Sequence, residues 1–402
     1  MRVVHINCVY AIGSTGKIVE DLSKYSVLHG DEVLVLYGRQ GKNLTSNVVK
    51  VSSEFEAKVH SLMSRLSGLD FSFSPFATKK VIDILSLYKP DVVHLHCLNG
   101  HFVNVYKLIK YLKRQNIPTV LTLHAEIMHT AGCEHAYDCT KWITGCFDCS
   151  KIKGRLTHFI RDDSKLAYRK MKEAFTGFDN LTVVSVSDWL SNRARQSAIF
   201  KHCNASFTTI ENGLDLKSFH LLQKAENPLI EKYNNKSPII LHVTPNFLHP
   251  LKGGKYVLEL AKVHPEWFFI IVGYNGNEIL PSNVIAIKHT QSKEELACYY
   301  NIADITLLTS KRETFSMVCA ESLACGTPVV GFKAGGPESV FIGSFAKFVD
   351  FGDIKVLGDT IREMINNNPN IDTDLIRKRF SAEKMAEKYN SIYNEIIKNI
   401  RK

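Results

Sequence analysis

The chain of 402 residues lacks the patterns that would place it outside the ordinary globular proteins. It has no run of 18 apolar residues, which excludes a helix built to span a membrane. It also has no low-complexity stretch, no internal repeat and no signature of a nucleic-acid-binding module. Residues 1–6 enter a strand pattern at once, so we expect no signal peptide and a cytoplasmic protein.

Acidic residues are scarce in the first half of the chain. Residues 1–200 contain 26 Lys and Arg against 18 Asp and Glu, a net charge of +8, whereas residues 201–402 contain 24 against 22, a net charge of +2. A basic half suits an anionic membrane surface or an acidic acceptor. The segment 151–172, dense in Lys and Arg, could lie on a membrane or form a solvated helix.

What the chain does contain is an alternation of short apolar runs with helical patterns, which predicts βα units and parallel sheets. The fold class is therefore α/β, with two doubly wound, Rossmann-like domains. We place them at 1–215 and 216–380, followed by a C-terminal helix at 381–402 that should pack on the first domain. Strands are expected at 2–8, 32–37, 91–96, 118–123, 181–187, 207–211, 238–244, 267–273, 284–288, 304–308, 327–331 and 346–349. Ligands of such sheets bind beyond the carboxyl ends of strands, so the expected site is the cleft between the domains.

Two acids, Glu313 and Glu321, stand on either side of the start of a helix that we expect to begin near Phe315. Two helical turns rise about 11 Å, so these acids can contact opposite ends of a nucleotide diphosphate sugar. The backbone N–H groups of residues 314–318 lie between them, and a helix N-terminus binds phosphate. Taken alone, the pair could equally be two solvated acids.

The residues around this pair resemble the donor half of family 4 glycosyltransferases, and the similarity continues in patches over most of the chain. The patches are ADITLLTS at 303–310, ETFS at 313–316, ESLACGTPVV at 321–330 and GGPE at 335–338. The resemblance implies the GT-B fold, a hexosyltransferase activity and retention of anomeric configuration. It implies that Glu313 contacts the donor sugar, that Glu321 holds the ribose, and that the donor site includes Thr314, Phe315 and Ser316.

Two further donor-side positions follow the first strands of the second domain. Lys252 stands where the family has a lysine that clamps the diphosphate, but the arginine usual just after the strand is replaced by residues 244–246. Lysine binds phosphate as a point charge, so donor binding stays in the prediction while other groups must supply part of the neutralising charge. Gly273 ends the next strand, where the nucleotide base would stack.

A small turn follows the first strand. Residues 11–17 are similar to a P-loop but fail its test, because Ala11 and Ile18 replace the glycine and the hydroxyl residue that the motif requires. Gly13 and Gly16 still allow backbone N–H groups to approach an anion, and the resemblance places this turn near the acceptor and the donor phosphates. A plain strand–helix turn is the alternative.

His124 follows the fourth strand, where the family commonly has His-Asp with the histidine beside the donor sugar, and we predict a catalytic role for it. Ala125 replaces the aspartate, which leaves Glu126 as the nearest acid, and no general base is assigned. His94, His96 and Cys97 are weaker candidates that we expect to line the end of the sheet.

A cysteine-rich insert at 130–150 contains Cys133, Cys139, Cys146 and Cys149, and resembles an insert of some polysaccharide-assembling family 4 enzymes. Four thiolates could hold one structural Zn²⁺, although the spacing is tighter than in common zinc modules. Free thiols are the main alternative and disulfides the lesser one, since cytoplasmic proteins rarely keep disulfides. We expect no catalytic metal.

Together these features predict a transferase that moves a hexose from a nucleotide diphosphate sugar, with UDP favoured over GDP. The acceptor would be lipid-linked or an oligosaccharide, in O-antigen, capsule or exopolysaccharide synthesis. The enzyme would work in the cytoplasm, in peripheral contact with the cytoplasmic face of the inner membrane and without nucleic acid. The alternatives are a nucleotide-sugar epimerase of the same fold and a catalytically inactive scaffold subunit.

Overall fold

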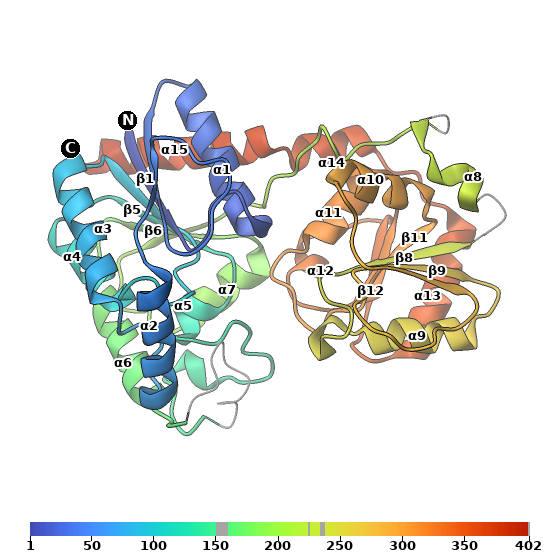
Figure 1. Cartoon of the computed structure of the whole chain (residues 1–402), viewed down its shortest axis with the longest axis horizontal. Coiled ribbons are helices and arrows are strands. Elements are labelled where there is room, and N and C mark those ends of the chain that lie inside the picture. Colours follow the sequence, from blue (N-terminus) through green and yellow to red (C-terminus); the bar gives the residue numbers. More distant parts are fainter. Residues whose placement is uncertain (150–159, 224–225, 234–237, 401–402) are drawn as a thin grey trace. The chain divides into compact units, whose positions relative to one another are not determined.

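Figure 1 shows the computed structural model, which describes residues 1–149, 160–223, 226–233 and 238–400; most of the lysine-rich half of segment 151–172 thus lies outside the described residues. The chain divides into two compact units, residues 1–211 with those from Met385 onward, and residues 212–384. The second unit is slightly wider than the predicted 216–380. Leu214 and Ser381 form an isolated parallel bridge within it. The segment by which the chain enters the second unit and the segment by which it leaves therefore both belong to this unit.

The first unit is built on a seven-stranded sheet in the order β3-β2-β1-β4-β5-β6-β7, with every pairing parallel. The strands are β1 (Arg2–Asn7), β2 (Glu32–Tyr37), β3 (Val48–Lys50), β4 (Val92–Leu95), β5 (Thr119–Leu123), β6 (Leu181–Ser185) and β7 (Ser206–Thr209). The sequence predicts all of them except β3. That strand has only 3 residues, too few for an alternating pattern to distinguish it from a loop.

Helices cover the sheet of the first unit. They are α1 (Gly13–Leu28), α2 (Glu54–Ser67), α3 (Pro75–Tyr88), α4 (Val105–Arg114), α5 (Ile127–Thr130), η1 (Lys141–Ile143), α6 (Ser164–Phe175), α7 (Asp188–Gln196) and, at the end of the chain, α15 (Ala382–Ile400). α15 packs on the sheet because its tyrosines recur every four residues along one side. Tyr389 and Tyr393 share a buried apolar cluster with Val3, Val92 and Val120 of three adjacent strands.

The second unit has a six-stranded parallel sheet in the order β10-β9-β8-β11-β12-β13. Its strands are β8 (Ile239–Val243), β9 (Phe268–Val272), β10 (Val284–Ile287), β11 (Ile305–Leu308), β12 (Val329–Phe332) and β13 (Ala346–Val349). Its helices are α8 (Leu229–Tyr233), η4 (Pro250–Lys252), α9 (Gly254–Val263), α10 (Lys293–Ile302), α11 (Met317–Ala324), α12 (Pro337–Val340), α13 (Ile354–Asn367) and α14 (Thr373–Arg379). Two doubly wound α/β units confirm the predicted fold class. Among the described residues, no helix is both long and apolar enough to cross a membrane.

The parallel sheets decide where the predicted site residues lie. The carboxyl ends of parallel strands meet at one edge of a sheet, and loops leave from there. In the first unit, Gly13 and Gly16 lie in the first turn of α1, which follows β1, and His124 lies in the loop after β5. In the second unit, the loops after β8, β9 and β11 carry Lys252, Gly273 and Glu313.

Candidate active site

Two of the charged residues predicted to bind the donor, Lys252 and Glu313, contact each other. Lys252 Nζ donates to Glu313 Oε1 at 2.7 Å, across 61 residues of sequence. The Lys252 carbonyl accepts a hydrogen bond of 2.8 Å from Thr309 Oγ1, which ties the loop after β8 to the end of β11. The next residue, Gly253, has a φ of 71°, and a Cβ there would lie 2.2 Å from the Thr309 carbonyl oxygen. Only glycine permits this approach, which holds Lys252 in reach of Glu313.

The loop that carries Glu313 is held by a second turn of the same unit. The Glu313 N–H donates to the Ala334 carbonyl at 3.0 Å, and the Gly336 N–H donates to the Glu313 carbonyl at 2.9 Å. A Cβ on Gly336 would lie 2.1 Å from the Thr314 carbonyl oxygen, so the two turns pack backbone to backbone. The Glu338 carboxylate accepts the Ala334 N–H at 2.9 Å. Glu313 is thus positioned by main-chain contacts rather than by its own side chain.

The helix after Glu313 begins later than the sequence predicts, at Met317 instead of near Phe315. Ser316, with a φ of 80°, is its N-cap, and its hydroxyl accepts a backbone N–H of the first turn. The Phe315 side chain is only 2% exposed and packs on Phe341 and Phe380, with ring centroids 5.5 and 5.9 Å away. The aromatic ring therefore belongs to the core, and only the Phe315 backbone could contact a donor.

Glu321 lies on α11 beside a buried tyrosine. Tyr300 Oη donates to Glu321 Oε2 at 3.0 Å, and Glu321 Oε1 accepts no hydrogen bond from the described residues. Burial raises the pKa of the Glu321 carboxyl to about 7, although the Tyr300 hydrogen bond acts in the opposite direction. The carboxyl is therefore close to half ionised near neutral pH, and in its ionised form it can accept sugar hydroxyls.

Gly273 is required by the packing of two loops. Its φ is 97°, and a Cβ there would lie 1.5 Å from the Thr244 carbonyl oxygen. The Phe247 N–H donates to its carbonyl at 3.0 Å. These contacts explain the glycine without a ligand, so its contact with a nucleotide base stays a prediction.

The turn after β1 in the first unit leaves the start of α1 open. Ala11 has a φ of 54° and Gly13 one of 63°, and a Cβ on Gly16 would lie 3.1 Å from the Ala11 nitrogen. α1 has no side-chain cap and no acid in its first turn. The Lys17 ammonium forms ion pairs with Glu20 at 3.1 Å and with Asp21 at 2.8 Å, both on the same helix. The N–H groups of the turn can therefore still receive an anion.

His124 lies at the carboxyl end of β5, half-buried, with its ring stacked on His96 at a centroid distance of 5.8 Å. Its Nε2 is 3.5 Å from His96 Nδ1. Burial lowers the pKa of His124 to about 4, so the imidazole is neutral at physiological pH. In this state it can donate or accept a hydrogen bond, but it supplies no positive charge.

A buried histidine cluster, formed by His5, His94 and His96, continues from His124 into the sheet. His5 and His94 are partners on adjacent strands, and His5 Nδ1 lies 3.1 Å from His96 Nε2. Burial lowers the pKa values of all three, which are therefore neutral. His94 and His96 were candidates from the sequence, but His5 was not. Its place in the first predicted strand, next to the strand of His94, could have indicated it.

The cluster is the one group of three or more metal-binding side chains with ligand atoms within 4.8 Å in the part of the chain that the structure describes. Both nitrogens of His94 are already used, since they lie 2.6 Å from Tyr393 Oη and 2.7 Å from Thr122 Oγ1. Thr122 Oγ1 is in turn 2.9 Å from Tyr389 Oη. The cluster is therefore a hydrogen-bonded core that joins α15 to β5, the strand that His124 follows.

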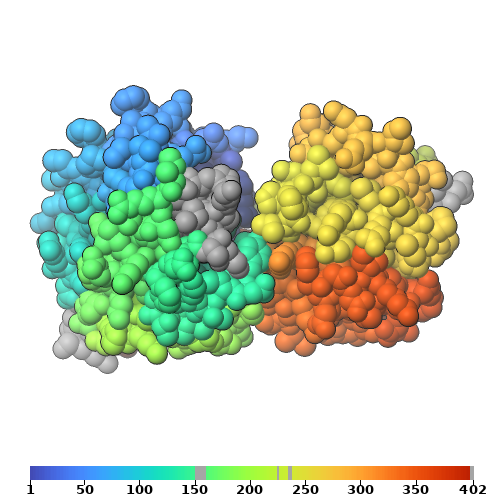
Figure 2. All heavy atoms as spheres, turned by 90° about the horizontal axis from the view of Figure 1, so that it is seen from below, coloured from blue at the N-terminus to red at the C-terminus, as the bar shows by residue number. Residues whose placement is uncertain are grey.

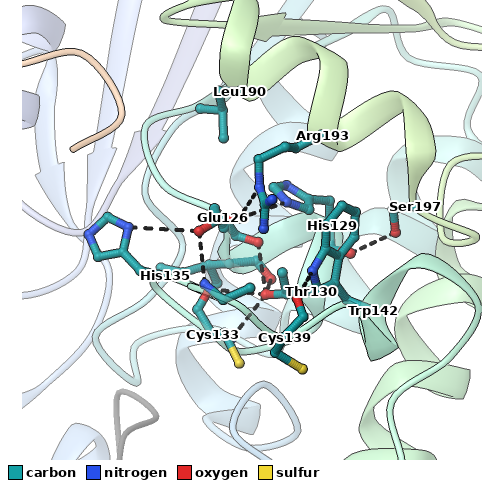
Figure 3. Close-up of polar contacts among 12 residues, drawn as sticks. Glu126, His129, Thr130, Cys133, His135, Cys139, Trp142, Leu190, Arg193 and Ser197 are labelled. Carbon is teal, nitrogen blue, oxygen red and sulfur yellow. Dashed lines mark hydrogen bonds and ion pairs between the residues drawn. The ribbon is translucent and has the colours of Figure 1, made fainter. Parts of the chain in front are cut away.

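Glu126, the acid nearest His124 in sequence, is committed to a buried ion pair (Figure 3). Arg193 Nε lies 2.6 Å from Glu126 Oε1, and the Ala136 N–H donates to Oε2 at 2.8 Å. His129 Nε2 is 3.6 Å away. Burial alone would raise the pKa of Glu126, but its contacts with His129, Arg193 and Ala136 lower it to about 2. A carboxylate held in this way is not free to activate an acceptor.

The cysteine-rich segment is anchored next to this ion pair and is visible at the surface in Figure 2 (teal). Trp142 is buried, donates from Nε1 to the Cys139 carbonyl at 2.7 Å, and has the Arg193 guanidinium 4.6 Å from its ring. Figure 3 shows the sulfurs of Cys133 and Cys139 directed away from Glu126. None of the four cysteines, which include Cys146 and Cys149, forms a disulfide among the described residues.

These thiols do not form a tetrahedral set as they are placed. Among the described residues, no three cysteine sulfurs lie within 4.8 Å of one another. A structural Zn²⁺ would need the four sulfurs to lie about 2.3 Å from the ion, and we assign zinc no role in the proposed reaction. The structural zinc stays a prediction, which metal analysis of the purified protein would test.

Comparisons with known proteins agree with this arrangement. Residues 15–218 match Glycosyltransferase Family 4, and residues 223–384 match Glycosyl transferases group 1. The chain is 21% identical to N-acetyl-alpha-D-glucosaminyl L-malate synthase of Bacillus anthracis, over 98% of this chain and 97% of that protein. It is 20% identical to WcaC of Escherichia coli K12, named as a colanic acid biosynthesis glycosyl transferase, over 98% of this chain and all of that protein (100%).

Solved structures show the same fold. Anabaena HepE in complex with UDP aligns with a TM-score of 0.69 at 15% identity, covering 98% of this chain and 100% of HepE. A sucrose-phosphate synthase from Thermosynechococcus elongatus aligns with a TM-score of 0.67 at 16% identity, covering 99% of each chain. The architecture is that of the GT-B glycosyltransferases. Since Glycosyltransferase Family 4 matches half of the chain, the protein belongs to that family and is a glycosyltransferase. The membership confirms the predicted family, whereas the significance of the cysteine-rich insert stays a prediction.

Proposed function

We propose that the enzyme transfers a hexose, with retention of anomeric configuration, from a nucleotide diphosphate sugar to a lipid-linked or oligosaccharide acceptor. UDP is the favoured carrier and GDP the alternative. The observation that carries the proposal is the Lys252–Glu313 ion pair, at 2.7 Å, on the carboxyl edge of the second sheet. It combines a cation for the diphosphate with an acid for the sugar.

The donor would lie along the carboxyl edge of the second unit. Lys252 and the backbone N–H groups at the start of α11 would stabilise the charge that develops on the departing diphosphate. Glu313 would orient the hexose, and Glu321 would accept the ribose hydroxyls. Glu313 is held by backbone contacts on both sides, so it can hold a sugar in line without reorganising.

The acceptor would meet the first unit. His124 is neutral, so it would serve as a hydrogen-bond partner of the sugar rather than as an acid, and the turn at Gly13 and Gly16 would add backbone donors. A surface-polysaccharide acceptor is supported by the similarity to WcaC over the full length of both chains. The basic net charge of residues 1–200 suits an acceptor that carries phosphate.

The experiment is to measure nucleoside diphosphate release by the purified chain across a panel of UDP- and GDP-sugars. Glu313→Gln should lose release almost completely and still bind the nucleotide, because the carboxylate that orients the hexose is lost while Lys252 remains to bind the diphosphate. Glu363→Gln is the matched control, since Glu363 is an exposed acid of the same unit that pairs with Lys347. Unchanged turnover in Glu313→Gln would remove the proposed role, and nucleotide binding without release from any donor would favour a binding subunit.

A further inference from the structure

Helix α2 of the first unit has its large apolar side chains on the outside. Its exposed residues include Phe55 (78% exposed), Val59, Leu62, Met63 and Leu66. A helix that packs on a globular core normally turns such residues inward. Five large apolar side chains on one exposed helix are more than the scattered single residues of an ordinary surface.

These side chains form one continuous stripe. At about 100° per residue, Phe55, Val59, Leu62 and Leu66 fall within an arc of about 60°. Met63 extends the stripe on one side. The spacing of four, three and four residues is that of a helix face made for contact with an apolar phase.

The opposite side of α2 fixes this orientation. The residues it buries are small or polar, namely Ala57, His60 and Ser64. His60 Nδ1 lies 2.8 Å from Ser74 Oγ, and His60 Nε2 lies 2.7 Å from the Asp70 carbonyl oxygen. Rotating the helix to bury its leucines would break both contacts, so the apolar stripe is a stable feature of the fold.

Positive charges border the stripe. Lys58 and Arg65 are exposed on one of its sides, and neither pairs with an acid among the described residues. The two acids of the helix are already engaged. Glu54 pairs with Arg39 at 2.9 Å, and Glu56 accepts the N–H groups at the start of α3. The outer face of α2 is thus apolar and cationic.

The stripe continues beyond the C-terminal end of the helix. The Ile160 N–H donates to the Arg65 carbonyl at 2.9 Å, and the Ile160 side chain is 76% exposed. Arg161 follows it, exposed and paired with Asp163 at 2.9 Å. An apolar side chain therefore extends the stripe from a second segment of the chain.

We propose that the outer face of α2, together with Ile160, docks on the surface of an anionic lipid bilayer. The apolar stripe would enter the boundary between headgroups and acyl chains, while Lys58 and Arg65 would contact lipid phosphates. The inference rests on the proposed function in one respect: a lipid-linked acceptor would lie in the same bilayer on which α2 docks. A second copy of the chain is a poorer occupant, because a symmetric contact would bring the cations of both copies together without free acids.

Vesicle flotation of the full chain tests the proposal. The chain should float with phosphatidylcholine vesicles that contain about 30% phosphatidylglycerol, and much less with phosphatidylcholine alone. Leu62→Glu combined with Leu66→Glu should lower the partition coefficient at least about tenfold. Lys58→Ala and Arg65→Ala should each lower it about fivefold on the anionic vesicles. Leu87→Glu is the matched control, because Leu87 is 84% exposed on α3 of the same unit.

Nucleoside diphosphate release separates this proposal from the proposed function. The double variant should keep the release of the wild-type chain, which shows that it folds and binds donor. Wild-type flotation by the double variant would overturn the docking surface. A dimer in sedimentation that the double variant abolishes would also overturn it, in favour of contact between copies. Flotation without release from any donor would instead contradict the proposed function alone.

Discussion

Lys252 and Glu313 are ion-pair partners, with Nζ and Oε1 2.7 Å apart. Both side chains are partly buried, and both come from loops that glycines hold against neighbouring backbone. Under the proposed function, this cation would already be in place when a diphosphate arrives. The donor would then have to offer Lys252 a better anion than the carboxylate that it contacts.

Lys252→Ala should weaken nucleoside diphosphate binding by about 10- to 100-fold, the range expected when one hydrogen bond to a charged group is lost. It should also leave Glu313 without its cation. Titration of UDP and GDP into the purified variant measures the effect. Lys255→Ala, one turn away on α9, is the control and should bind as the wild type does. Equal affinities for the two variants would contradict the assigned role.

Glu321→Gln should raise the melting temperature at pH 8 and leave it nearly unchanged at pH 4. The pKa of Glu321 rises from 4.5 to about 7 on folding, so the folded chain keeps a proton that the unfolded chain loses in this window. Stability therefore falls as the pH rises from 4.5 to 7, and the full cost is present above 7. Thermal unfolding at both pH values checks this. An equal shift at both would show a packing effect instead of ionisation.

His124→Asn should reduce transfer about 100-fold or more without changing the shape of the pH profile between pH 6 and 8. The pKa of His124 is lowered to about 4, so the imidazole does not titrate in this interval. Turnover measured from pH 6 to 8 for both proteins tests this point. His202→Asn, an exposed histidine of the same unit, is the control. A limb near pH 6.5 that only the wild type shows would mean that His124 does ionise.

Glu126→Gln should destabilise the chain by about 3–5 kcal/mol, because it leaves the half-buried Arg193 without its carboxylate. Since contacts lower the pKa of Glu126 to about 2, its contribution is complete above 4.5 and is lost as the pH falls towards 2. Urea unfolding at pH 7 and pH 3 measures both effects. Arg193→Met added to Glu126→Gln should recover part of the loss. If the double variant is as unstable as the single one, the uncompensated charge is not the cause.

The strands could be predicted because each carries its own signal. A buried parallel strand is a short apolar run between turn residues, as at Phe268–Val272, and it needs no knowledge of its neighbours. β3 was missed because three residues hold no period. The helix start at Met317 was misplaced because Ser316 adopts a φ of 80° that the sequence does not show.

The site was predictable only in part. The residues Lys252 and Glu313 came from a resemblance, and their contact across 61 residues is a property of the folded sheet edge. Phe315 stands in the same motif yet points into the core, which no spacing rule reveals. Glu126 pairs with Arg193 of α7, 67 residues later in the chain. The position of Glu126 close to His124 in the sequence therefore could not show that its carboxylate is held in an ion pair.

The hydroxyls of Tyr389 and Tyr393 have a consequence for the order of assembly. They complete the hydrogen bonds of Thr122 and His94, which lie 267 and 299 residues earlier in the chain. During synthesis, the strands of the first unit emerge long before the helix that satisfies them. That unit must therefore wait for the whole of the second one to be translated before its interior closes. A chain that ended near residue 380 would leave the core of the first unit exposed and its hydrogen bonds incomplete.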